Sequence, residues 1–122
     1  MWVGGGVTFG PRNERNYKRK INKKVRAKAL ATVLSQKIRE NELILVEDVK
    51  FDTPKTRDAR AVLESLAKNE SFGDLLNKNS NAALIATAIR DENTEKSFAN
   101  FNTMFVDEIR NLNVADVLNY KY

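Results

Sequence analysis

The residues best suited to chemistry lie in the first quarter of the chain, where three consecutive glycines precede a dense run of cations. Gly4, Gly5 and Gly6 are followed by nine basic residues and a single acid, Glu14, between positions 12 and 28. Lysine supplies a point charge, and the planar guanidinium of arginine can form two parallel hydrogen bonds to one phosphate. Glycine lets a backbone bend sharply and lie against a ligand without a Cβ in the way. This combination indicates a polyanionic ligand.

The glycines alone allow three interpretations. A nucleotide loop that cradles phosphate normally follows a strand and opens a helix, and neither GxGxxG nor GxxxxGK[ST] occurs in the chain. A flexible tail or an appended leader is the second interpretation, and a backbone that passes close to a ligand is the third. We favour the third, because glycine permits the bends and the close approach that such a path needs.

The net charge of +5 conceals an uneven distribution of charged residues. Residues 1–28 carry nine basic side chains against one acid, a net charge of +8, whereas residues 29–122 carry twelve against fifteen, a net charge of −3. A basic run is usually only a solvated surface, but this one also contains Tyr17 and several arginines. In RNA recognition, aromatic and guanidinium planes stack on unpaired bases while cations neutralise the backbone. The pattern favours such a partner, with an affinity that falls steeply with salt.

Composition excludes several classes of function. The chain of 122 residues has no cysteine and no histidine, which rules out disulfides, zinc–thiolate sites, catalytic triads and imidazole acid–base chemistry. No apolar run approaches the roughly 18 residues of a membrane span, and the first residues lack the features of a secretory signal. We therefore expect a cytoplasmic protein of one domain that uses neither a metal nor a cofactor.

The elements that must position the basic run alternate between helices and strands. Apolar residues recur at three- and four-residue spacing after Asn22, which predicts a helix that this residue caps and that ends near position 41. Uninterrupted apolar runs predict buried strands at 42–49 and 82–89, and a third strand is expected at 104–106.

Capping residues mark the remaining helices. Thr53 precedes a proline, which predicts a helix start there, and Thr94 and Asn113 are expected to cap two short helices. The element order predicts an α/β fold: a three-layer, open, mainly parallel sheet of Rossmann-like topology, with helices on both faces and an extended basic N-terminal arm. The expected division is an RNA-binding arm at 1–21 and a globular domain at 22–122.

Several motifs resemble those of the bacterial large-subunit ribosomal protein four family. They begin with WxGGGVxFGP, continue with RxY and NKKVRxxAL, and include LILVEDV, TPKT and RNLNVADVLNYKY. The resemblance covers essentially the whole chain, and its first block is the most specific part. It implies a structural, non-enzymatic component of the large ribosomal subunit. The family places an α/β domain on the solvent side and threads a long arm into ribosomal RNA near the peptide exit tunnel.

The resemblance also implies which residues contact RNA, because the family's arm and its basic helix start match this chain from Trp2 to Arg26. The positions carried over as RNA-binding are Trp2, Gly4, Gly5, Gly6, Phe9, Arg12, Arg15, Tyr17, Lys18, Arg19, Lys20, Asn22, Lys23, Lys24 and Arg26. Lys55 and Arg110 lie in two further matching turns, where a structural role is at least as strongly expected.

By the same resemblance, the chain is expected to be incomplete. The family's N-terminal region, the outgoing half of its loop and a final strand after LNYKY have no counterpart here, and that strand lies inside the family's sheet. Its absence would leave the strands that start at Leu43 and Ala82 without a backbone partner, which is costly. We therefore expect the isolated chain to be marginally stable or to self-associate.

The expected partners are large-subunit (23S-type) rRNA and neighbouring ribosomal proteins, without a membrane. Regulatory RNA binding stays open, because the resemblance implies that some members bind their own messenger leader. A small α/β enzyme would use Glu47, Asp48 and Asp52 at the carboxyl end of the first strand, where open sheets bind ligands. A protein-interaction domain would use the apolar face exposed by the missing strand.

Overall fold

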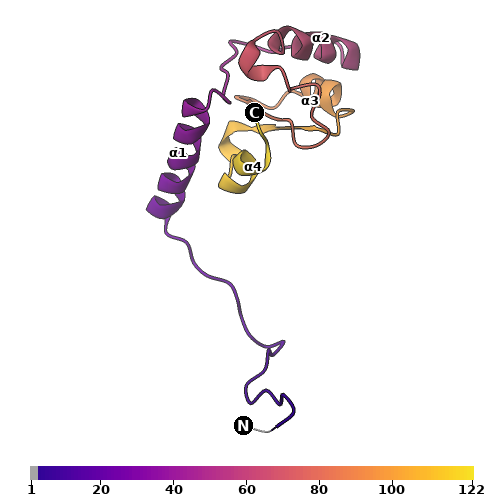
Figure 1. Ribbon diagram of the computed structural model, residues 1–122. Coiled ribbons are helices and arrows are strands. Elements are labelled where there is room, and N and C mark those ends of the chain that lie inside the picture. The colour runs from indigo at the N-terminus through magenta and orange to yellow at the C-terminus, as the bar shows by residue number, and fades with distance from the viewer. Residues whose placement is uncertain (1–2) are drawn as a thin grey trace.

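The computed structural model describes residues 3–122, so Trp2, one of the predicted RNA-binding residues, lies outside the described part. Residues 3–22, the leading segment, contain neither helix nor strand and extend away from the rest of the chain (Figure 1). Helix α1 (Lys23–Arg39) joins this segment to residues 40–122, the body. The body contains α2 (Thr56–Leu66), η1 (Glu70–Phe72), β1 (Ala83–Thr87), α3 (Glu92–Phe98), β2 (Met104–Glu108), η2 (Ile109–Asn111) and α4 (Val114–Asn119). Among the described helices, none is long and apolar enough to cross a membrane.

The sheet consists of β1 and β2, which pair in parallel with Ala83 opposite Met104 and Thr87 opposite Glu108. Parallel neighbours need a crossover, and α3 supplies it. On the other edge of β1, Tyr122 donates its N–H to the Ala82 carbonyl (3.0 Å) and accepts the Leu84 N–H (2.8 Å). The α/β class and the parallel pairing are therefore confirmed, as are a strand within the predicted range 82–89 and one that begins at 104 as predicted but continues two residues beyond 106, to Glu108.

The core lies between one face of this sheet and the helices α2 and α3. Its buried members are Ala59, Leu63, Leu75, Ala83 and Phe98. The ring of Phe98 meets that of Phe51 edge-on, with centroids 5.9 Å apart. On the opposite face, Phe105 stacks on Tyr120, which ends α4, with centroids 6.1 Å apart. Helices α2 and α4 accordingly lie on opposite sides of the strands (Figure 1).

The strand predicted at 42–49 is wrong for this structure. These residues form no regular element, and the side chain of Leu45 is 91% exposed. Apolar composition favours a strand only where a neighbouring backbone completes the ladder of hydrogen bonds. Within the described residues the sheet contains β1 and β2 only, so the run at 42–49 has no ladder to join. The predicted three-stranded, three-layer arrangement is therefore not formed here.

Two predicted helix starts also need correction. Helix α2 begins at Thr56 instead of after Thr53, because Lys55 is extended and donates its N–H to the hydroxyl of Ser97 (3.1 Å). Helix α3 is capped by Asp91 and not by Thr94; the Asp91 carboxylate accepts the N–H of Thr94 at 3.0 Å. The predicted cap at Asn113 is confirmed, since its side chain accepts the Asp116 N–H (2.8 Å).

Candidate nucleic-acid interface

The leading segment is an extended and solvated piece of backbone. Each of its residues except Gly10 is exposed. Two local hydrogen bonds shape it: the Arg15 N–H donates to the Arg12 carbonyl (3.3 Å), and the Lys18 N–H donates to the Asn16 side chain (2.9 Å). A segment with so few internal bonds keeps most of its peptide groups available to a ligand.

Two of the three consecutive glycines hold backbone conformations that other residues rarely adopt. The φ angles are +124° at Gly4 and +85° at Gly5. A Cβ built on either residue would meet no atom within 4 Å, so the requirement for glycine comes from the backbone angle and not from crowding. The sharp path that the glycines were expected to allow is therefore present at Gly4 and Gly5.

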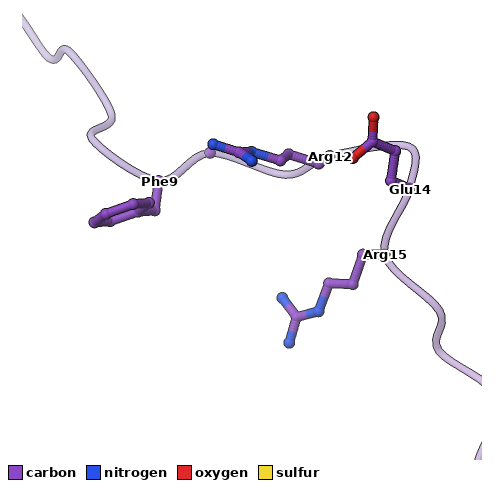
Figure 2. A pocket seen from close by; sticks show the side chains of 5 residues that line it. Phe9, Arg12, Glu14 and Arg15 are labelled. Carbon is purple, nitrogen blue, oxygen red and sulfur yellow. The ribbon is translucent and has the colours of Figure 1, made fainter.

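An open hollow lies beside the turn that follows these glycines, lined by Phe9, Gly10, Arg12, Glu14 and Arg15. Figure 2 shows the side chains of Arg12 and Arg15 extending toward the side on which Phe9 lies, whereas the Glu14 carboxylate turns away from them. An aromatic face next to two guanidinium groups offers a stacking surface for a base together with phosphate donors. The hollow is too open to enclose a small substrate.

Tyr17 continues this chemistry a short distance along the segment. The guanidinium carbon of Arg15 lies 5.2 Å from the centre of the Tyr17 ring, which is a cation–π contact. The Tyr17 side chain is 70% exposed. The contact therefore leaves much of the Tyr17 side chain open to solvent.

The basic side chains between positions 12 and 28 have no acidic partner among residues 3–122. None of the nine lies within 4 Å of a carboxylate in the described residues, although Glu14 is close in sequence. All nine are exposed, and they sit on the leading segment and on the first turns of α1. Positive charges that are solvated and unpaired are free to neutralise phosphates and release their counterions.

The first turns of α1 carry cations where an isolated helix would disfavour them. Lys23, Lys24 and Arg26 lie at the positive end of the helix dipole, and the first turn contains no acid. Asn22 occupies the N-cap position as predicted, yet its side chain makes no capping hydrogen bond. Local helix stability therefore does not explain these residue types, whereas an anionic ligand would.

All the predicted RNA-binding residues except Trp2 lie in the described part of the chain. The leading segment holds Gly4, Gly5, Gly6, Phe9, Arg12, Arg15, Tyr17, Lys18, Arg19, Lys20 and Asn22, and α1 holds Lys23, Lys24 and Arg26. They follow one another along the part of the chain that projects from the body (Figure 1), and the hollow beside Phe9 is open. A long, exposed track of this kind suits a polymer.

The body offers less to a polyanion. Arg110, in η2, forms an ion pair with Glu108, and the Lys55 N–H donates to the hydroxyl of Ser97. The enzyme alternative required carboxylates at the end of a strand at 42–49, and that strand is not formed. Residues 3–122 contain no group of three or more acids arranged to hold a metal ion.

Sequence reasoning missed two lysines of α1. Lys28 is exposed and unpaired like the predicted cations, and the charge run itself was the signal for including it. Lys37 is mostly buried and contacts the body; its signal was its position on the apolar stripe of the helix, four residues after Val33. Lys28 extends the row of exposed cations, whereas Lys37 joins α1 to the body.

Comparison with known proteins gives one consistent match. The model of the ribosomal protein L4/L1 family matches residues 1–122. Large ribosomal subunit protein uL4 of Mycoplasma mycoides is 38% identical over 119 residues, which cover 98% of this chain and 52% of that protein. The uL4 of Natranaerobius thermophilus is 34% identical over 122 residues, covering 100% of this chain and 53% of that protein. The uL4 of Oceanobacillus iheyensis is 35% identical over 118 residues, covering 97% and 51%.

The names of these relatives match the family that the sequence motifs resemble. The chain spans about half the length of the curated relatives that it matches. The match of the family model over all 122 residues decides the assignment: this chain belongs to the ribosomal protein L4/L1 family.

Proposed function

We propose that this chain is a structural, non-enzymatic component of the large ribosomal subunit that binds large-subunit rRNA through the leading segment and the first turns of α1. One observation carries the proposal: nine basic side chains lie exposed and without an acidic partner on the part of the chain that projects from the body. Such a row of cations attracts RNA phosphates strongly, and its irregular backbone can follow the path of the RNA. The relatives, named as large ribosomal subunit proteins, support the same reading.

The mode of binding follows from the side chains along the track. Lysines such as Lys20 and Lys23 neutralise phosphates as point charges, and Arg12 and Arg15 grip phosphates with paired hydrogen bonds. Phe9 and Tyr17 supply exposed rings on which unpaired bases stack. Gly4 and Gly5 let the backbone turn close to the RNA. The leading segment becomes ordered along the RNA, and the body holds it in place.

The setting of this interaction belongs to the same proposal. The arm lies near the peptide exit tunnel, and neighbouring large-subunit proteins contact the body, in a cytoplasmic ribosome. The proposal includes the three-layer sheet, which needs a further strand beside β1, with residues 1–21 as an arm and 22–122 as the globular domain. The family assignment supports this setting, because members of the family carry the name of a ribosomal protein.

The test is a salt titration of the affinity for a large-subunit rRNA fragment. One variant changes Lys20, Lys23, Lys24 and Arg26 to alanine. A matched control changes Arg39, at the end of α1 next to the body, and Arg57, Lys68 and Lys78 of the body to alanine and so removes the same total charge. Each lost phosphate contact lowers the slope of log affinity against log salt by about 0.7 to 0.9. We expect the first variant to lose a slope of about 3 and at least about tenfold in affinity near 0.15 M salt.

The control should keep a slope near that of the original chain, because its four cations lie outside the proposed track. Equal losses in both variants would mean that net charge alone attracts the RNA. An unchanged affinity and slope in the first variant would refute RNA binding by this segment. A competing messenger leader that binds more tightly than the rRNA fragment would redirect the proposal toward regulatory RNA binding.

A further inference from the structure

Helix α1 meets the body along one narrow stripe. Its half-buried positions include Ala29, Leu30, Val33 and Leu34, and none of its residues is fully buried. Lys37 continues this stripe one turn later and is the only charged residue on it; its side chain is 15% exposed. A lysine so shielded from water requires hydrogen-bond partners for its ammonium group.

The ammonium of Lys37 has three oxygen partners. Its Nζ donates to Oε2 of Glu42 (2.6 Å), to the carbonyl of Tyr120 (3.0 Å) and to the carbonyl of Lys121 (2.8 Å). Three donors meet three acceptors, so the hydrogen-bonding capacity of the group is filled. Two of these acceptors belong to residues more than 80 positions away in the chain.

The turn that ends α1 brings Glu42 to the lysine. Asn41 has a φ of +55°, and the Glu42 N–H returns to the Lys37 carbonyl (2.9 Å). This is the Schellman arrangement, in which a left-handed residue after the helix folds the chain back onto its last turn. This turn places the Glu42 side chain beside Lys37 through contacts local to the end of α1.

The other two acceptors are tied to the sheet. The Lys121 N–H donates to the Asn81 carbonyl (3.1 Å), and the Tyr122 N–H donates to the Ala82 carbonyl (3.0 Å), directly before β1. A continuous path of hydrogen bonds therefore runs from α1 through the Lys37 ammonium to the edge of β1. Apolar contacts along a stripe resist separation of a helix more than they resist its rotation, whereas directional bonds fix its angle.

We propose that Lys37 is a positioning residue that fixes the direction of α1, and so of the basic track, relative to the body. The effect of Lys37 on RNA binding rests on the proposed function: a basic segment whose direction is already fixed loses less conformational entropy when it binds RNA. The orientation itself can be measured without RNA. Lys37 does not contact the RNA; it acts through the helix that carries Lys23, Lys24 and Arg26.

The test uses the absence of cysteine in the chain. Exposed Ala27 on α1 and exposed Ala61 on α2 are changed to cysteine and spin-labelled, and the distribution of distances between the labels is measured. Into this background we introduce Lys37→Met, which keeps an unbranched side chain, one heavy atom shorter, and removes its donors. Arg39→Met is the matched control, because it removes one cation from the same turn of α1 at a position exposed to solvent.

We expect a narrow distribution for the parent and for Arg39→Met, and a distribution at least about twice as broad for Lys37→Met. Lys37→Arg should restore the narrow distribution, because a guanidinium can also donate to several oxygens. A narrow distribution in Lys37→Met would overturn the proposal. If Lys37→Met fails to fold, Lys37→Gln, whose side chain is shorter and uncharged, should still broaden the distribution because it weakens the bonds to the Tyr120 and Lys121 carbonyls, and an unchanged width there would overturn the proposal.

The affinity for the rRNA fragment tests whether the direction of α1 affects RNA binding, which the distance measurement does not address. Lys37→Met should bind about three- to tenfold more weakly than Arg39→Met, with the same salt slope, because ordering costs rise while the phosphate contacts stay the same. Equal affinities of the two variants would overturn the role of Lys37 in positioning the track. If the parent itself lacks salt-dependent affinity, the proposed function fails, and the distance distributions still decide whether Lys37 orients α1.

Discussion

Charged side chains behave differently in the leading segment and in the body. Every ion pair among the described residues lies at or beyond Lys37, such as Lys121 with Asp74 (2.8 Å) and Arg60 with Glu64 (2.9 Å). Residues 12–28 contain nine cations and no ion pair. The body disperses opposite charges over its surface, whereas the leading segment keeps one sign unpaired, as the proposed binding to a polyanion requires.

Aromatic side chains show the same contrast. In the body, Phe98 packs against Phe51 and Phe101, and Phe72 packs against Tyr122. In the leading segment, Phe9 is 85% exposed, and Tyr17 contacts the guanidinium of Arg15 but no other aromatic ring of residues 3–122. The body packs its aromatic residues against one another, whereas the leading segment leaves its own exposed, as the proposed stacking on RNA bases requires. Substitutions in the two regions should therefore affect different measurements.

The largest effect is expected in the core. Phe98→Ala removes a ring that is 3% exposed and leaves a cavity between α2, α3 and the sheet, so the free energy of unfolding should fall by about 3–5 kcal/mol. Thermal and denaturant unfolding would measure this loss. A change below about 1 kcal/mol would show that the body is not held together by this core.

The counterpart in the leading segment is Phe9→Ala. This change should leave the unfolding transition where it is and weaken binding to the rRNA fragment by about 1–3 kcal/mol, the usual worth of one stacked base. Exposed Val7 is the matched control, because Val7→Ala removes an apolar side chain two residues away without removing a ring. Loss of thermal stability in Phe9→Ala would contradict the division between the two regions.

Acid should act on the body through the cap of α3. The hydroxyl of Thr94 donates to the Asp91 carboxylate, and this bond, with the backbone N–H groups of Thr94 and Asn93, lowers the pKa of Asp91 below its ordinary value. A lowered pKa in the folded state means that the carboxylate stabilises the body above the ordinary value of about 3.9 and that this contribution is lost as the pH falls below it.

Asp91→Asn should therefore lower the melting temperature at pH 7 and make the acid limb of stability against pH shallower. Melting curves between pH 7 and pH 2.5 would measure both effects. The control is Asp58→Asn, at an exposed position of α2. Parallel curves for Asp91→Asn and the parent would show that the cap does not contribute to acid sensitivity.

The smallest effect concerns the run at 42–49, which belongs to the body in sequence but resembles the leading segment in exposure. Ile44, Leu45 and Val46 are exposed apolar side chains without a strand partner among the described residues. We expect the isolated chain to self-associate weakly or to melt below about 65 °C. Size-exclusion chromatography with thermal melting tests this expectation. A monomer that melts sharply above that temperature would refute it.

Part of the fold could be predicted because its signals are local. The spacing of apolar residues after Asn22 identified α1, and the apolar runs identified β1 and β2, since both depend on a few neighbouring residues. The choice of Thr94 over Asp91 as a cap was wrong because both residue types cap well, and the extended backbone at Asp91 decides between them. The start of α2 depends on Ser97, which lies 42 residues beyond Lys55.

The exposure of the nine cations between positions 12 and 28 could be predicted from the sequence, because so many like charges with one acid among them cannot be buried or paired locally. Lys37 could not, since its role depends on carbonyl groups at the far end of the chain. The run at 42–49 shows the limit from the other side. Its residues have the composition of a strand, but a strand forms only when a second segment pairs with it, and local composition does not reveal that partner.

Hydrogen exchange in the presence and absence of the rRNA fragment tests the division most directly. In the free chain, the amides of residues 3–22 should exchange fast, because few of them are hydrogen-bonded, while β1 and α2 exchange slowly. On binding, we predict strong protection of residues 3–22 and of the first turns of α1, with little change in α2 and α3. Protection confined to the body, with residues 3–22 still exchanging fast, would contradict the account.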